Sequence, residues 1–162
     1  FMMTLMAGGG RAMMEAAARA ATDVAAELTM PRPLLLGVTV LTSLDVDDLQ
    51  ATGVSGGVAD QVRRLAELAK LAGLDGVVCS PLEAGVLRGD LGLEFKLVTP
   101  GVRPTWAEAN DQKRIMTPVE AISAGADYLV IGRPISAAKD PAAAAARIAL
   151  ELAPTLAGKA PQ

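Results

Sequence analysis

The sequence contains no histidine and only one cysteine, Cys79. A single cysteine cannot form a disulfide framework within the chain, which favours a reducing compartment and predicts a cytoplasmic protein. Cys79 is also a weak candidate for a nucleophile, because it lies in the apolar stretch "GVVCS" and no imidazole is available to activate its thiol. We therefore expect Cys79 to be a small residue of the hydrophobic core.

Runs of basic residues and long hydrophobic runs are also absent. The formal net charge is −3, and no cluster of Lys or Arg marks a surface for nucleic acid or for an anionic membrane. The opening stretch "FMMTLMAGGG" is too short to span a membrane and lacks the basic start of a signal peptide. We interpret it as a buried strand. Because the chain begins inside this strand, we expect that part of the domain precedes Phe1.

A chain of 162 residues, of which 51% are hydrophobic, is long enough to bury one core, and we expect a single domain over residues 1–162. Short apolar stretches alternate with helical ones. Strands are expected at residues 2–7, 33–41, 76–80, 95–100 and 127–132, and helices at residues 11–28, 58–72, 118–124 and 140–152. The strands lack polar alternation, which is typical of parallel strands that are covered on both faces.

Repeated β/α units of this kind require crossover connections and a parallel sheet, either an open sheet or a (β/α) barrel. The segments after the last two strands favour the barrel, because barrels often bind phosphate with those loops. They read Thr99-Pro100-Gly101-Val102-Arg103 and Gly132-Arg133-Pro134. A complete barrel has eight strands and roughly 250 residues, so about three β/α units are expected to be missing from the front.

The segment after the fourth predicted strand is long and polar, and its residues suit a phosphate ligand. The guanidinium fork of Arg133 matches phosphate oxygens, and Gly132 lets the backbone come close to them. Gln112 can donate from a neutral amide, and Arg103 follows the preceding strand. The alternative is that Arg103 and Arg133 are surface arginines beside turn prolines. The two glycines, the two strand-end arginines and the long polar loop together favour phosphate binding.

Other conspicuous groups have structural explanations. Asp45, Asp47 and Asp48 could indicate a metal site, but an N-cap followed by acidic residues in the first turn of a helix explains them. The three glycines at residues 8–10 lack the dinucleotide-binding fingerprint and fit a turn from strand to helix. Trp106, the only tryptophan, lies in the polar loop and could either fold over a ligand or pack the loop.

Several motifs together resemble one family. The stretches "LLLGVTVLTSLD", "LAKLAGLDGVVCS", "EFKLVTPGVRP" and "NDQKRIMTPVEAISAGADYLVIGRPI" are similar to the C-terminal two-thirds of bacterial orotidine 5'-phosphate decarboxylases. The resemblance covers nearly the whole chain. It implies strands four to eight of a (β/α)8 TIM barrel that converts orotidine 5'-monophosphate to UMP in pyrimidine biosynthesis without a cofactor. Sugar-phosphate epimerases, a sister class of barrels, are not expected to combine "TPGVRP" with "DQKR".

The resemblance also implies ligand contacts and a partner. Thr42 in "VLTS" resembles the family's pyrimidine-side contact. Arg103 in "TPGVRP" and Gln112 in "DQKR" resemble ligand contacts of the closing phosphate loop, and Gly132 and Arg133 in "IGRP" resemble the phosphate cradle. Members of the family tend to dimerise, which implies a homodimer.

Two departures from the family concern catalysis. Its Lys/Asp array centres on an Asp-x-Lys-x-x-Asp motif that this sequence does not contain, so no catalytic residue is expected in the chain. Met6 stands where the family usually carries a histidine, and its thioether cannot donate a hydrogen bond. Three interpretations stay open: a decarboxylase without its front third, a non-catalytic fragment that binds nucleoside monophosphates, or a half-barrel whose exposed edges pair with another chain, for example a complementing N-terminal segment.

Overall fold

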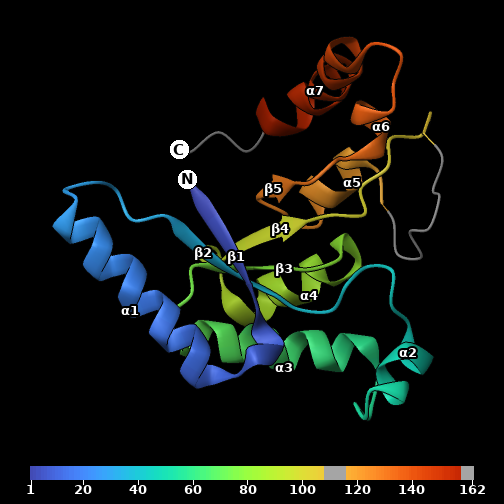
Figure 1. Ribbon diagram of the computed structural model, residues 1–162. Coiled ribbons are helices and arrows are strands. Elements are labelled where there is room, and N and C mark those ends of the chain that lie inside the picture. The colour runs from blue at the N-terminus through green and yellow to red at the C-terminus, as the bar shows by residue number, and fades with distance from the viewer. Residues whose placement is uncertain (108–115, 158–162) are drawn as a thin grey trace.

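The computed structural model describes residues 1–107 and 116–157, which form a curved sheet with helices packed along it (Figure 1). Five parallel strands follow one another in the order β1-β2-β3-β4-β5, so their order in space is their order in the chain. They are β1 (Met2–Met6), β2 (Leu34–Val38), β3 (Gly76–Val78), β4 (Lys96–Thr99) and β5 (Tyr128–Leu129). Because all strands run the same way, their carboxyl ends meet at one edge of the sheet.

Helices connect the strands and pack on them and on one another. They are the 3-10 turn η1 (Ala7–Gly9), α1 (Arg11–Glu27), α2 (Val46–Ala51), α3 (Val58–Leu71), α4 (Pro81–Leu91), α5 (Pro118–Ser123), α6 (Arg133–Ser136) and α7 (Pro141–Ala157). The predicted parallel β/α order is confirmed. The bounds of α4 were not predicted, because two glycines weaken the amphipathic pattern of its sequence "PLEAGVLRGDL".

The prediction that the first strand is buried is wrong for this chain. Met3 and Met6 are 59% and 52% exposed, and Phe1 is 85% exposed. Within the described residues β1 pairs only with β2, so no neighbouring strand covers its outer side. The last strand is also shorter than predicted, since β5 ends at Leu129 although the apolar stretch continues to Ile131.

Several helices begin at side-chain caps that the sequence supplies. Asp45 accepts hydrogen bonds from two backbone N–H groups in the first turn of α2, at 3.1 and 3.2 Å, which confirms the cap interpretation of the acidic cluster. Thr117 and Glu120 form a capping box at α5, and hydrogen bonds from the Thr117 hydroxyl and backbone hold the pKa of Glu120 below its usual value. Asp140 caps α7 in the same way, at 2.9 Å.

The larger hydrophobic core lies between the sheet and the helices α1, α3 and α4. Its buried side chains include Met14, Val62, Val77, Leu87 and Leu97. Cys79 belongs to this core and is 1% exposed, which confirms the prediction from the sequence. A smaller cluster of Val102, Ala121 and Ala126 lies beside it. Each core joins residues that are distant in the chain, so the strands cannot move independently of the helices.

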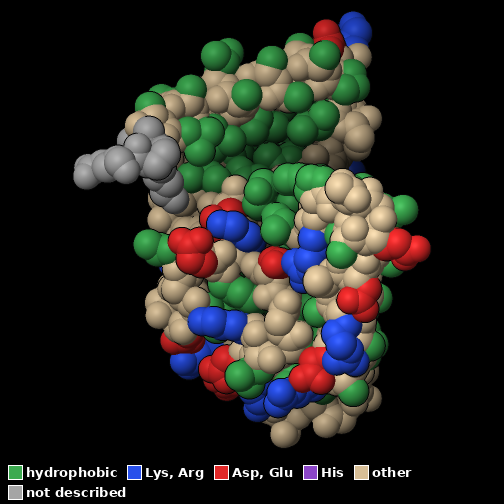
Figure 2. All heavy atoms as spheres, turned by 90° about the vertical axis from the view of Figure 1, so that its left-hand side faces the viewer, with side chains coloured by type: hydrophobic (Ala, Val, Ile, Leu, Met, Phe, Trp, Pro, Cys, Tyr) green, Lys and Arg blue, Asp and Glu red, His purple; other side chains and the backbone are tan. Residues whose placement is uncertain are grey.

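A large hydrophobic surface is exposed beneath α7 and beside β1. Figure 2 shows a hollow lined by hydrophobic side chains beneath α7, and an apolar cavity of about 500 Å³ lies between β1 and α1. The ring of Phe1, the residue before β1, meets the ring of Tyr128 of β5 edge to face, with their centroids 5.7 Å apart. The two edge strands therefore come close through these side chains. Their backbones do not pair in the described part of the chain. Exposed hydrophobic surface of this extent is typical of a face that another polypeptide covers.

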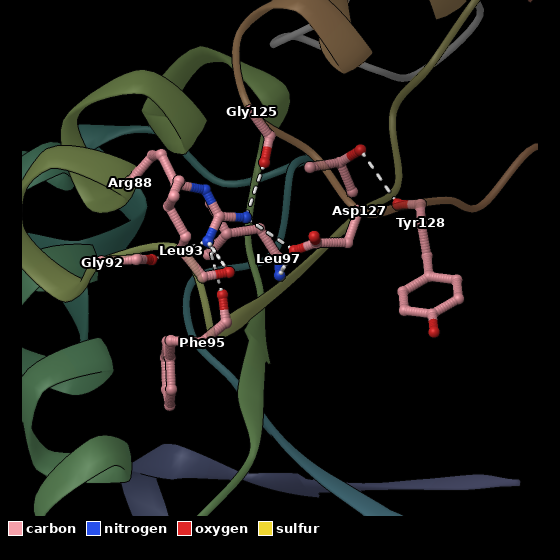
Figure 3. Close-up of polar contacts among 9 residues, drawn as sticks. Arg88, Gly92, Leu93, Phe95, Leu97, Gly125, Asp127 and Tyr128 are labelled. Atoms are coloured by element: carbon pink, nitrogen blue, oxygen red, sulfur yellow. Dashed lines mark hydrogen bonds and ion pairs between the residues drawn. The ribbon is translucent and has the colours of Figure 1, made fainter. Parts of the chain in front are cut away.

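Arg88 of α4 joins the amino ends of β4 and β5 (Figure 3). Its guanidinium donates hydrogen bonds of 2.7 to 3.1 Å to the carbonyl oxygens of Gly92, Leu93, Phe95 and Gly125. It also donates to the carboxylate of Asp127 at 2.6 Å, and that carboxylate accepts from the backbone N–H of Leu97 at 2.7 Å. One side chain therefore fixes the positions of the C-terminal end of α4, the start of β4 and the start of β5 relative to one another.

Replacing Arg88 with alanine is expected to lower the free energy of unfolding by about 2 kcal/mol. The substitution removes hydrogen bonds from a charged donor that is 14% exposed and leaves the half-buried Asp127 without its counter-ion. Urea denaturation followed by circular dichroism measures the change. Arg63→Ala is the matched control, because Arg63 donates to Asp90 at 2.8 Å from a more exposed position and should cost less than about 1 kcal/mol. Equal losses in the two variants would contradict the prediction.

Candidate functional site at the carboxyl edge of the sheet

Buried polar side chains gather at the carboxyl edge of the sheet. In the part of the chain that the structure describes, every buried polar or charged side chain lies at or just after the end of β2, β3 or β4: Thr39, Thr42, Ser80, Glu83, Thr99 and Arg103. Burial of polar groups is unfavourable unless they find partners, so proteins concentrate them where they serve a purpose. Ligands of parallel α/β proteins bind at this edge, which makes it the candidate site.

Side-chain and backbone hydrogen bonds continue past the strands and align their carboxyl ends. The hydroxyl of Thr39 donates to the carbonyl of Val78 at 2.8 Å, and the backbone N–H of Cys79 donates to the carbonyl of Val98 at 3.1 Å. The backbone N–H of Val130 donates to the carbonyl of Thr99 at 2.9 Å. These bonds place the ends of β2 to β5 at one level, so residues that follow different strands lie along one edge of the sheet.

A small cavity opens between the ends of β2, β3 and β4. It measures about 240 Å³, and its lining includes Thr42, Ser43, Cys79 and Pro100. Thr42, the predicted pyrimidine-side contact, therefore lies in a cavity at the predicted edge. Both apolar and polar side chains line the cavity, which is the usual composition of a site for a small organic ligand.

The two predicted arginines lie at the same edge but in different surroundings. Arg103 is 6% exposed, and its Nη1 donates to the carbonyl of Val102 at 2.9 Å. Arg133 is exposed at the start of α6, directly after Gly132. Among the described residues, apart from Gly132 and its two chain neighbours, no atom lies within 4 Å of the place where a Cβ of residue 132 would stand. The interpretation of Arg103 as an exposed surface arginine is wrong, because that side chain is buried.

One predicted residue, Gln112, lies outside the described residues. Conversely, sequence reasoning did not single out the buried Ser80, Glu83 and Thr99 as part of the site. A signal was available for each, because Ser80 is the first polar residue after β3, Thr99 is the last residue of β4, and Glu83 lies in the first turn of the helix that Ser80 caps. Strand-end polar residues are common, so the signal could not separate these from ordinary loop residues.

The residues that the structure describes contain neither a cation site nor a membrane segment. Among the described residues, no three side chains of His, Cys, Asp or Glu come together as metal ligands would. Over the same residues no helix has the length and apolar character to cross a bilayer. The chemistry available at the edge is that of hydroxyls, guanidinium groups, backbone amides and one buried carboxylate.

The fold and this edge define a parallel β/α protein whose candidate ligand site lies at the carboxyl ends of its strands. Residues 1–148 match the orotidine 5'-phosphate decarboxylase / HUMPS family, and the chain belongs to that family. It is 62% identical over 151 residues to the orotidine 5'-phosphate decarboxylase of Rhodospirillum rubrum, covering 93% of this chain and 61% of that protein. The corresponding protein of Paramagnetospirillum magneticum is 56% identical, with 92% and 63% covered.

Solved structures agree with the sequence comparison. The crystal structure of orotidine 5'-phosphate decarboxylase from Lactobacillus acidophilus superposes with a TM-score of 0.76 at 37% identity, over 93% of this chain and 62% of that one. An uncharacterised conserved protein from Geobacillus kaustophilus superposes with a TM-score of 0.74 at 36% identity, over 91% and 61%. The chain thus spans about three-fifths of the length of the relatives that it matches.

Proposed function

We propose that this chain is the substrate-binding part of an orotidine 5'-phosphate decarboxylase and that it binds orotidine 5'-monophosphate or UMP. The observation that carries the proposal is the gathering of Thr42, Arg103, Gly132 and Arg133 at one edge of the sheet in a chain of this family. Relatives at 52 to 62% identity bear the name of this enzyme. The reaction is the decarboxylation that yields UMP in pyrimidine biosynthesis.

We propose further that the five strands are strands four to eight of a (β/α)8 barrel. The unclosed sheet, the exposed Phe1, Met3 and Met6, and the hydrophobic hollow in Figure 2 support this proposal. Three further β/α units would cover that surface and pair with both edges. They would come from a complementing N-terminal segment, while a second copy of the chain could cover the same surface in a homodimer.

In this proposal each residue at the edge has one role. The guanidinium of Arg133 and the open backbone at Gly132 bind the phosphate dianion, with Gln112 as a neutral donor to the same group. Thr42 contacts the pyrimidine from the cavity beneath. Arg103 is buried where β4 ends, so it supports the loop and adds positive charge beside the ligand. Binding energy from the phosphate, which does not react, can be used to exclude water from the reacting carboxylate.

The proton-transfer step requires residues that this chain does not contain. By resemblance to the family, carbon dioxide leaves C6 of the pyrimidine and a lysine protonates the carbanion. That lysine belongs to the Asp-x-Lys-x-x-Asp motif, which the sequence does not contain. A non-catalytic protein that binds nucleoside monophosphates is therefore the second candidate function, because the proposed phosphate-binding residues are present in the sequence and the proton-transfer motif is not.

Replacing Arg133 with alanine is expected to weaken UMP binding about ten- to a hundredfold and to leave uridine binding nearly unchanged. Only the nucleotide carries the dianion that the guanidinium recognises. Isothermal titration with both ligands is the measurement, and Arg19→Ala, which changes an exposed arginine of α1, is the control. Gln112→Ala should act in the same direction but less strongly, because its amide is neutral. Equal losses for UMP and uridine would show that Arg133 supports the fold instead.

A further inference from the structure

Trp106, in the segment that follows β4, is held by two residues of α7. Its indole N–H donates to a carboxylate oxygen of Glu151 at 2.9 Å. The guanidinium of Arg147 lies over the indole ring, 4.6 Å from its centroid, and approaches the same carboxylate oxygen at 3.6 Å. Arg147 and Glu151 stand one turn apart on α7, so the helix holds the indole by its edge and by its face at once. We call these three residues the tryptophan clamp.

The clamp connects the two sides of the proposed phosphate site. Arg103 precedes Trp106 in the same segment. Directly after Arg103, a hydrogen bond of 2.9 Å from the backbone N–H of Ala107 to the carbonyl of Pro104 closes a turn that contains Trp106. On the other side, α7 packs against α6, whose first residue is Arg133. A rigid connection between Trp106 and α7 therefore sets the position of the Arg103 segment relative to the helices that carry Arg133.

The clamp lies outside the apolar packing of the protein. Neither hydrophobic cluster contains Trp106, and α7 turns Ala144 and Ile148 inward while Arg147 and Glu151 remain partly exposed. A half-exposed contact of this kind adds little to global stability, because solvent screens the ion pair. The main effect of the clamp is therefore on geometry, because it restricts the position of the segment after β4 relative to α7.

We propose that Trp106 is a positioning residue for phosphate binding, and that its clamp on Arg147 and Glu151 holds the two arginine-bearing segments at the separation that a nucleotide phosphate requires. This inference rests on the proposed function. It predicts that loosening the clamp weakens binding of the nucleotide and spares the nucleoside, although no clamp residue has to touch the ligand.

Glu151→Ala tests the inference with a matched control in the same chain. Arg11 and Glu15 on α1 form an ion pair with the same spacing and nearly the same exposure, 60% and 33% against 59% and 33% for Arg147 and Glu151. We expect Glu151→Ala to weaken UMP binding about three- to tenfold in isothermal titration, with uridine binding unchanged, and Glu15→Ala to change neither. Glu151→Gln keeps an oxygen acceptor for the indole and should restore most of the UMP affinity.

Trp106 itself supplies a second measurement, because the chain contains no other tryptophan. Glu151→Ala should make the fluorescence of Trp106 easier to quench with acrylamide, while Glu15→Ala should leave it unchanged. An unaltered preference for UMP over uridine in Glu151→Ala would overturn the inference alone, as would equal losses for both ligands or an effect of Glu15→Ala. An unmodified protein that did not prefer UMP to uridine would instead overturn the proposed function, and this inference with it.

Discussion

Mixed with a second chain that supplies the first three β/α units of the proposed barrel, this protein is expected to release carbon dioxide from orotidine 5'-monophosphate, and alone it is expected not to. The groups that would transfer the proton belong to an Asp-x-Lys-x-x-Asp motif that the sequence does not contain. The phosphate binding that we propose for Arg133 would not supply that proton or the electrostatic stabilisation of the carbanion. Enzymes typically accelerate reactions at least about a millionfold, so an ordinary assay should detect carbon dioxide release from the mixture and none from this protein alone.

The Rhodospirillum rubrum relative offers a source for the second chain, namely the part of it that lies outside the region matched by this protein. The two chains are purified separately, their masses are verified, and carbon dioxide release is measured for each and for the mixture. A complementing chain whose motif lysine is replaced by alanine is the control, since it should bind without restoring turnover. Robust turnover by this protein alone would contradict the prediction and direct the search for a base to Asp45, Lys96 and Asp111.

Replacing Gly76 with alanine is expected to lower the free energy of unfolding by more than about 3 kcal/mol. Gly76 begins β3 and stands opposite Lys96 of β4 in the parallel pair. A Cβ at this position would overlap the carbonyl oxygen of Lys96 and lie 2.8 Å from its carbonyl carbon. The obstacle is backbone of a central strand, which cannot turn aside as a side chain would. β3 and β4 would have to separate, and the hydrogen bonds that align Cys79 with Val98 would lengthen.

Gly89→Ala is the control for this substitution. Gly89 lies inside α4, and no atom stands within 4 Å of the place where its Cβ would be. Alanine should stabilise the helix there by about 0.5 to 1 kcal/mol. Chemical denaturation of the three proteins, followed by circular dichroism, measures both changes. A Gly76→Ala protein as stable as the unmodified one would mean that β3 and β4 are not in the register described.

Local features were sufficient to predict most of the secondary structure. Asp45, Thr117 and Asp140 accept hydrogen bonds from backbone N–H groups of the turns that follow them, so helix starts are determined within a few residues of sequence. The apolar strands were found because parallel strands need no polar alternation. α4 was not delimited because its glycines and weak amphipathic pattern hide it, although Ser80 and Pro81 mark its start.

The candidate site could be predicted only in part. Arg133 and Gly132 follow a strand in the sequence, and parallel topology brings such positions to one edge. Which strand-end residues are buried there could not be predicted, because burial depends on the helices that pack over each strand. Glu83 and Thr99 are buried, and their positions in the first turn of α4 and at the end of β4 do not by themselves predict that burial.

The sequence by itself determined the strands, the helix starts, the parallel order and the family, because each of these follows from residues that are close together in the chain or from a pattern spread along it. The tertiary structure decided which distant residues meet. It placed Asp127 beside both Arg88 and the backbone of Leu97, and it set Trp106 against α7. It also left β1 exposed, because burial of an edge strand requires a neighbour on each side, and among the described residues β1 pairs with β2 alone.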